Sequence, residues 1–213
     1  MAIHSLSIVH PKAQISEKAE IGPFAIIEKD VFIGDGTIIG SHSVIKQWTS
    51  IGNNNKIGIG VVIGEIPQDI KFKNIKSYCK IGNNNIIREY VTIHRATEEE
   101  STTQIGNENF LMAYSHIAHN CQIGNKVVIV NYAGLSGYVC VEDEAFISGL
   151  AGIHQFVKIG TLSIIGGHSK ITQDVPPYVM AEGNPAKLKG LNVIGLKRSG
   201  FSEETRNILK KTY

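Results

Sequence analysis

A single aliphatic residue recurs at every sixth position along most of this chain, and this period limits the possible folds more than any other feature. Counting in sixes from Val9 to Ile171 gives 28 positions, of which 26 are Ile, Val or Leu, and only Asp69 and Glu99 break the series. A period of six fits neither the 3.6-residue repeat of an α-helix nor the 3.5-residue repeat of a coiled coil. The pattern instead predicts short strands that each bury one aliphatic side chain.

Three such strands close one coil of 18 residues, and coils of this kind stack about 4.8 Å apart. The sequence therefore predicts an all-β fold over residues 1–190, a parallel β-helix shaped as a triangular prism. β-Branched Ile suits a buried strand position, and each coil buries its apolar face against its neighbours. Gly often follows the aliphatic residue, with Asn or Asp after it, as in IGDG and IGNNN. We expect these residues to supply the left-handed and turn conformations at the corners.

Two segments and the C-terminal part of the chain depart from the coil pattern. Residues 65–74 and 96–104 are polar and contain the two breaks, so we expect loops there. Such loops are either tolerated insertions or places for binding groups. Three prolines in residues 175–187 end the coils, and residues 191–213 are expected to form a short helical segment. Its helix begins after Ser202, a suitable N-cap, with Glu203 and Glu204 in the first turn.

Composition excludes several classes of function. Charged residues make up 19% of the chain and the net charge is +2, which favours neither nucleic acid nor a membrane surface as the main partner. No apolar run approaches the roughly 18 residues of a membrane span. The three cysteines, Cys79, Cys121 and Cys140, are widely spaced without a CxxC pair. They are interpreted as buried small hydrophobic residues of a cytoplasmic protein.

The 18-residue coil also serves as a coordinate system for polar residues. His119, Gly137 and Gln155 are 18 residues apart, so we expect them in one column on successive coils. His116 and His154 fall beside that column. The sequence therefore predicts a polar cluster on one edge of the prism, within roughly 10 Å.

This cluster suits acyl transfer to an alcohol. A histidine can remove a proton from a hydroxyl near neutral pH, and the backbone N–H of Gly137 can stabilise an oxyanion on an acyl carbonyl. Two other interpretations stay open, solvated surface histidines and a zinc site. The i, i+3 pair in HIAHN disfavours zinc, because its two side chains fall on different faces of the corner and no acidic partner is evident.

Residues 8–201 resemble the UDP-N-acetylglucosamine O-acyltransferase family of lipid A biosynthesis. Motifs such as IREYVTIHR, SHIAH and HQF, in this order, are more specific than single six-residue repeats. The matching stretches are IGPF (21–24), IGEIPQDIKF (63–72), NNIIREYVTIHR (84–95), NFLMAYSHIAHNC (109–121), GLAGIHQFVKIG (149–160), QDVPPYV (173–179) and GLKRSGF (195–201). The resemblance implies a left-handed β-helix and a cytoplasmic homotrimer with active sites between subunits.

The resemblance further implies transfer of an acyl chain from acyl carrier protein to the 3-position of UDP-N-acetylglucosamine or its 3-amino analogue. Phosphopantetheine on the carrier holds the donor, and no separate cofactor or metal is implied. His119 matches the general base and Gly137 the oxyanion donor. Positions around the sugar and the acyl chain are matched by Gln68, Asp69, Lys71, His94, His116, His154 and Gln155. Asn192 and Arg198 match nucleotide-side or carrier-facing positions, and Gly167 matches the region that measures acyl length.

Three residues depart from the family pattern: Asn120, where Asp is usual, Tyr138, where His is common, and Ile194, which is acidic in some members. The family also continues into a longer helical bundle than residues 191–213 supply, which bears on docking of the carrier. Two alternative functions are an acyl-CoA-dependent sugar acyltransferase on the same scaffold, and a non-catalytic or metal-binding relative similar to a γ-type carbonic anhydrase.

Overall fold

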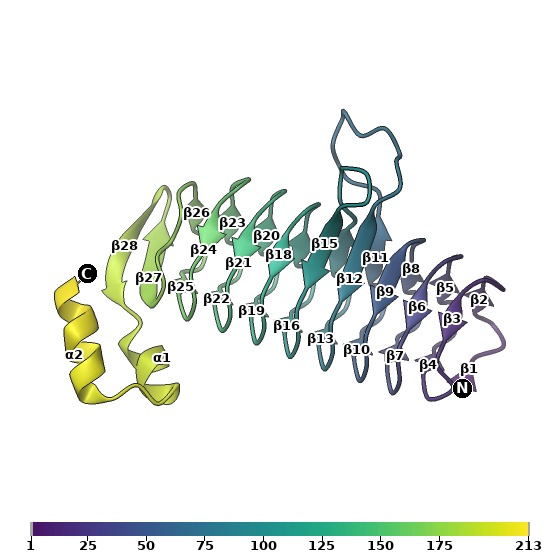
Figure 1. Ribbon diagram of the computed structural model, residues 1–213, viewed down its shortest axis with the longest axis horizontal. Coiled ribbons are helices and arrows are strands. Elements are labelled where there is room, and N and C mark those ends of the chain that lie inside the picture. The colour runs from purple at the N-terminus through teal and green to yellow at the C-terminus, as the bar shows by residue number, and fades with distance from the viewer. Residues whose placement is uncertain (1, 213) are drawn as a thin grey trace.

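Short strands follow one another around three faces of a long prism in the computed structural model, which describes residues 2–212 (Figure 1). The first face has eleven strands: β1 (Ala2–Ile3), β4 (Glu20–Ile21), β7 (Ile38–Ile39), β10 (Lys56–Ile57), β13 (Ile86–Ile87), β16 (Phe110–Leu111), β19 (Val128–Ile129), β22 (Phe146–Ile147), β25 (Ile164–Ile165), β27 (Val179–Gly183) and β28 (Ala186–Leu191). The second face has nine: β2 (Ile8–Val9), β5 (Ile26–Ile27), β8 (Val44–Ile45), β11 (Val62–Glu65), β14 (Thr92–His94), β17 (His116–Ile117), β20 (Gly134–Leu135), β23 (Gly152–Ile153) and β26 (Lys170–Ile171). The third face has eight: β3 (Gln14–Ile15), β6 (Phe32–Ile33), β9 (Thr49–Ile51), β12 (Tyr78–Ile81), β15 (Thr102–Ile105), β18 (Gln122–Ile123), β21 (Cys140–Val141) and β24 (Lys158–Ile159).

The register between coils is the one that the period predicts. His116 on β17 pairs with Gly134 on β20, and Gly134 pairs with Gly152 on β23, each step being one parallel coil. At the next corner the backbone N–H of Tyr138 donates to the carbonyl of His119 at 3.0 Å. The predicted column through residues 119, 137 and 155 is therefore confirmed.

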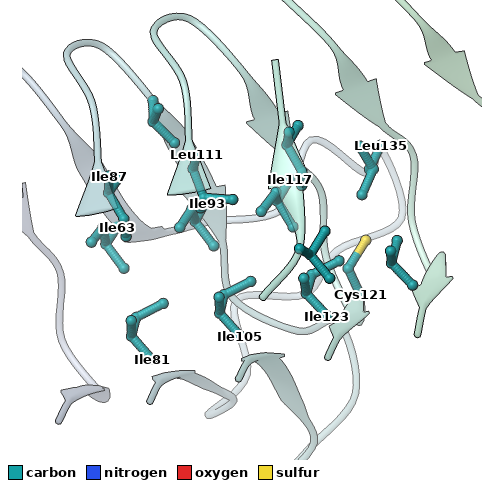
Figure 2. Packing of buried hydrophobic residues seen from close by; sticks show 14 of the residues in the cluster. Ile63, Ile81, Ile87, Ile93, Ile105, Leu111, Ile117, Cys121, Ile123 and Leu135 are labelled. Atoms are coloured by element: carbon teal, nitrogen blue, oxygen red, sulfur yellow. The ribbon is translucent and has the colours of Figure 1, made fainter. Parts of the chain in front are cut away.

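The aliphatic column forms the core (Figure 2). Inward residues such as Ile63, Ile93 and Ile117 are fully buried, and each contacts its counterparts on neighbouring coils. Two expectations are wrong. Ile75 continues the six-residue series but lies half-buried in a loop outside the core, and Cys140 is only half-buried because it points outward from β21.

The repeat glycines have a different role from the one expected. The left-handed corner residue falls later in each repeat, as at Asn54 (φ 55°) and Asn84 (φ 57°), and Tyr, Phe, Leu and Lys also occupy it. Gly40, by contrast, has no positive φ. A Cβ there would lie 2.5 Å from the carbonyl oxygen of Gly58 on the next coil. Glycine is required at such positions because two backbones approach closely, not because the chain turns left-handed.

Asparagine side chains tie the coils together at the corner between the third and first faces. The backbone N–H of Asn53 donates to Oδ1 of Asn83 at 2.7 Å, and that of Asn83 donates to Oδ1 of Asn107 at 2.8 Å. Asn107 donates in the same way to Asn125 at 2.8 Å. The ladder satisfies backbone donors that no strand partner reaches.

Both breaks in the period are loops, as predicted, although their bounds differ. Ile63 pairs with Ile93, thirty residues on, and Ile81 pairs with Ile105, twenty-four on, instead of eighteen. Residues 66–77 and 95–101 therefore lie outside the strands. The second loop ends earlier than expected because residues 102–104 pair with residues 78–80. Both loops extend from the same edge of the prism (Figure 1).

The C-terminal part contains more structure than one helix. β27 runs parallel to β25 and forms an antiparallel hairpin with β28, and helices α1 (Val193–Arg198) and α2 (Glu203–Thr212) follow. The predicted N-cap of α2 is confirmed, because Oγ of Ser202 accepts from the N–H of Thr205 at 3.1 Å. The sequence pattern missed the hairpin and α1. Neither helix in residues 2–212 has the length and apolarity needed to cross a membrane.

Candidate active site

A cleft of about 460 Å³ opens beside the corner between the second and third faces. It runs over β17, β20 and the turns that follow them. Six of the residues expected at the site line it: Gln68, His116, His119, Gly137, His154 and Gln155. Five of these come from three successive coils, and Gln68 comes from the first loop, so the coil register accounts for most of the site.

His119 follows β17 in the turn at this corner and is only 7% exposed. Its imidazole lies against the Cα of Gly137 on the next coil. A Cβ at Gly137 would be 2.3 Å from Cε1 and 2.6 Å from Nε2 of the ring. Only glycine leaves room for His119 in this position.

Hydrogen bonds to Asn120 determine the tautomer that a neutral His119 ring adopts. The amide atom of Asn120 that lies 3.0 Å from the backbone N of Thr97 must be the oxygen, because a backbone N–H can only donate. That oxygen also lies 3.0 Å from Nδ1 of His119, so Nδ1 is the donor. Nε2 then carries the free lone pair, which is the state that a general base requires.

The Gly137 N–H is available to a ligand. Within residues 2–212 it donates to no backbone or side-chain acceptor. The Cα of Gly137 lies against the imidazole of His119 on the adjacent coil, and both residues line the cleft. A base and a free backbone donor thus share one edge of the cleft, as attack on an acyl carbonyl requires.

Two further histidines are held neutral. Burial, with the nearby charge of His116, lowers the pKa of His94 from 6.5 to about 4. Burial and then His119 also lower the pKa of His116. The two rings meet edge to face at 4.8 Å, and Nδ1 of His116 lies 2.8 Å from Oγ1 of Thr92. His94 lies beneath the cleft and does not line it, and its Nδ1 has no partner in the described chain.

The first loop holds Asp69 and Lys71 near the cleft without placing them in its wall. The carboxylate of Asp69 accepts from the backbone N–H of Lys71 at 2.8 Å and so shapes the loop. Lys71 itself is exposed. Arg95 stacks on Trp48 at 4.8 Å and on Phe72 at 5.5 Å, which holds the loop against the prism.

Three of the expected residues lie elsewhere on the chain. Gly167 is in the turn between the first and second faces, the opposite edge of the second face from His119. Asn192 and Arg198 line a separate, largely apolar groove of about 700 Å³ over β22, β25 and α1. Asn192 caps α1 there, accepting from Gly195 N at 2.8 Å and donating to the carbonyl of Leu162 at 2.8 Å.

Sequence reasoning missed Thr97 and Glu98, which the second loop places against Asn120. Nδ2 of Asn120 donates to the carboxylate of Glu98 at 2.6 Å, and the Tyr138 hydroxyl donates to the same carboxylate. The signal available was an acidic run in a loop that interrupts the coil immediately before the histidine motif. That run indicated a loop but not which of its three glutamates contacts Asn120.

Comparison with known proteins identifies the family. The acyl-[acyl-carrier-protein]–UDP-N-acetylglucosamine O-acyltransferase of Thermodesulfovibrio yellowstonii is 55% identical over 212 residues, covering 99% of this chain and 82% of that protein. Its namesake from Syntrophobacter fumaroxidans is 46% identical over 215 residues, covering 100% and 83%. This chain belongs to that O-acyltransferase family.

Family models and solved structures agree with this assignment. The model "Bacterial transferase hexapeptide (six repeats)" matches residues 3–47 and 102–137, and "Udp N-acetylglucosamine O-acyltransferase; Domain 2" matches residues 174–213. The UDP-N-acetylglucosamine acyltransferase of Francisella novicida superposes with a TM-score of 0.96 at 41% identity, covering 99% of this chain and 78% of that one. The O-acyltransferase of Moraxella catarrhalis gives 0.97 at 43%, covering 100% and 83%. The fold is the parallel β-helix that the six-residue period predicted, with the left-handed winding that the resemblance implied.

The three residues that we expect to depart from the family pattern are Asn120, Tyr138 and Ile194, and the structure shows what surrounds each of them. Asn120 lies between His119 and Glu98. Tyr138 meets the His119 ring edge to face at 5.3 Å and stacks on Phe156 at 4.8 Å. Ile194 is 67% exposed at the rim of the groove that Asn192 and Arg198 line.

Proposed function

We propose that this chain transfers an acyl group from acyl carrier protein to the 3-hydroxyl of UDP-N-acetylglucosamine, the first step of lipid A biosynthesis, with His119 as general base. The observation that carries the proposal is that the free Nε2 of His119 lies against Gly137, whose backbone N–H has no acceptor among residues 2–212. Family membership supports the choice of donor and acceptor, because both are in the names of the relatives.

The reaction follows from these two groups. Nε2 of His119 removes the proton of the sugar hydroxyl as its oxygen attacks the thioester carbonyl. The oxyanion accepts a hydrogen bond from the N–H of Gly137. When the tetrahedral intermediate collapses, the C–S bond breaks and the imidazolium returns its proton to the phosphopantetheine thiolate. The products are the 3-O-acyl sugar nucleotide and the free carrier thiol, and no separate cofactor takes part.

The remaining candidate residues receive binding roles in this proposal. Gln68, His116, His154 and Gln155 line the cleft around the sugar and the start of the acyl chain. His94, which is neutral and whose Nδ1 has no partner among the described residues, supports the sugar side from beneath. The first loop brings the exposed cation of Lys71 to the nucleotide phosphates and holds Asp69 near the sugar. Asn192 and Arg198 serve the nucleotide or the carrier, and Gly167 limits the acyl chain.

A homotrimer would unite these groups. On one chain, Gly167 lies at the opposite edge of the second face from His119 and Asn192 lines a separate groove, so in this proposal a second subunit supplies them to the cleft. Along the corner that also carries Gly167, half-exposed rings stack on one another, Tyr90 on Tyr114 and Tyr114 on Tyr132 at 5.1 Å each. They offer apolar surface for that contact. Light scattering on the purified protein should give three times the mass of the chain, and a monomer would contradict this arrangement. We place the reaction in the cytoplasm, as the family resemblance implies.

The decisive experiment measures turnover of UDP-N-acetylglucosamine and its 3-amino analogue against carrier-linked 3-hydroxyacyl chains of several lengths, with acetyl-CoA as a further donor. We expect turnover of the hydroxyl acceptor with one range of carrier-linked chains. His119→Ala should lose at least about 1,000-fold in kcat with an unchanged unfolding temperature. Turnover of acetyl-CoA alone, or near-full activity of His119→Ala, would overturn the proposal.

A further inference from the structure

Two successive hydrogen bonds, through the side chain of Asn120, connect the carboxylate of Glu98 to His119, the proposed base. Its Oε2 accepts from Nδ2 of Asn120 at 2.6 Å, and Oδ1 of the same amide lies 3.0 Å from Nδ1 of His119. Among the described residues, no acidic group is bonded to His119 directly. The chain of hydrogen bonds therefore runs from the imidazole of His119 to the amide of Asn120 and on to the carboxylate of Glu98.

The orientation of each group along this chain of hydrogen bonds is fixed. The backbone N–H of Thr97 holds Oδ1 of Asn120 toward His119, so Nδ2 has to face Glu98. Oγ of Ser101 and the hydroxyl of Tyr138 donate to the carboxylate from its other sides. Burial raises the pKa of Glu98, but hydrogen bonds from Tyr138, Asn120, Ser101 and Thr97 outweigh it and leave the pKa below the usual value. Glu98 is ionised at neutral pH.

We propose that Glu98 is a positioning residue that acts through Asn120. It holds the ring of His119 with Nε2 toward the cleft, and it supplies the negative charge that stabilises the imidazolium during transfer. Asn120 alone cannot do this, because its amide is neutral. This inference rests on the proposed role of His119 as base.

The other charged groups around His119 do not replace Glu98. The neighbouring histidines are His94, His116 and His154, and they would repel an imidazolium if they were protonated. Two other carboxylates lie in this region. Glu65 raises the pKa of His94, and Asp69 raises the pKa of Tyr138.

The test uses Glu98→Gln, because the Gln oxygen can still accept from Nδ2 of Asn120 while its NH2 group donates to the hydroxyl of Tyr138, so that mainly the charge is lost. We expect kcat to fall about tenfold, the effect of removing one partly screened charge near the imidazolium, with KM unchanged. The acidic inflection of log(kcat/KM) should move to lower pH, because the protonated ring loses its stabilising charge. Glu99→Gln is the matched control. It removes the same charge from the next residue of the loop, which is exposed and forms no ion pair in the described chain.

A second variant separates charge from loop structure. Asn120→Asp combined with Glu98→Gln moves the carboxylate next to Nδ1 of His119. The amide introduced at position 98 can then donate to the carboxylate introduced at position 120 while accepting from Tyr138. We expect kcat to return to within about threefold of the parent enzyme. A Glu98→Gln variant with parental kcat and pH profile, or a double variant no more active than Glu98→Gln, would overturn the inference. An inactive parent enzyme would instead refute the proposed function.

Discussion

Replacing Gly137 by Ala tests whether close packing between two coils holds the base in place. The new Cβ would lie 2.3 Å from Cε1, 2.6 Å from Nε2 and 2.9 Å from Nδ1 of His119. Carbon atoms pack at about 3.5 Å or more, so the ring has to retreat by about 1 Å. We expect this movement to disturb the hydrogen bond from Nδ1 to Asn120, now 3.0 Å.

The expected losses of activity and stability follow from this displacement of the His119 ring. A misplacement of about 1 Å in a reacting group lowers the rate by about 100-fold. Overpacking should lower the free energy of unfolding by about 1–3 kcal/mol. The backbone N–H of residue 137 is still present in the variant, so the loss of activity should act through His119.

The assay is kcat/KM for acyl transfer to UDP-N-acetylglucosamine, with urea unfolding as the measure of stability. Gly152→Ala is the matched control, because a Cβ there meets no atom within 4 Å. It should keep parental activity. The combined variant His119→Ala, Gly137→Ala should be no less active than His119→Ala alone, since both changes remove the same positioned ring. Gly137→Ala with more than a third of the parental kcat/KM would refute the reasoning.

Three further predictions concern charge and packing. The pKa of His94 is about 4 in the folded chain against 6.5 in the unfolded one, so the unfolded chain binds more protons as the pH falls from about 6.5 to 4. The free energy of unfolding should drop by up to about 3 kcal/mol over that window, measured by urea unfolding, and a His94→Asn variant with the same drop would contradict this cause. Lys71→Ala should raise the KM for the nucleotide sugar about tenfold with little change in kcat, and a loss confined to kcat would assign Lys71 another role. Ile117→Ala, at a fully buried position, should lower the free energy of unfolding by about 2–5 kcal/mol, whereas Ile86→Ala, 41% exposed on an outer face, should change it by less than about 1 kcal/mol; equal losses would show that burial does not decide the difference.

The fold was predictable because one constraint repeats. Each inward residue such as Ile93 faces the same requirement as its counterpart one coil away, so the period survives in the sequence as a direct record of packing. Ile75 shows the limit of that record, since a loop whose length is a multiple of six keeps the phase while leaving the core. The repeat glycines show another limit. Their sequence context matches that of a turn, and only the backbone of the next coil reveals that the space for a Cβ is missing.

The site was predictable as far as the coil arithmetic reaches. His119, Gly137 and Gln155 share a column because strands fix their spacing. The position of Glu98 cannot be predicted in this way, because the residue lies in an irregular loop. The six-residue period therefore does not indicate which residues its side chain contacts. The prediction that Gly167 and Asn192 take part in the site came from the family resemblance alone. Within a single chain, both residues lie away from the cleft.

The two loops add twelve and six residues to the coils, and both begin and end at a corner of an otherwise uninterrupted prism. The prism is consequently a scaffold whose loops can change without changing the stacking of its coils. The loops that carry Gln68 and Glu98 can be lengthened, shortened or exchanged. The aliphatic columns and the His119–Gly137 contact keep their spacing when this happens. In such a molecule, the recognition of substrates and the stability of the scaffold are free to diverge separately.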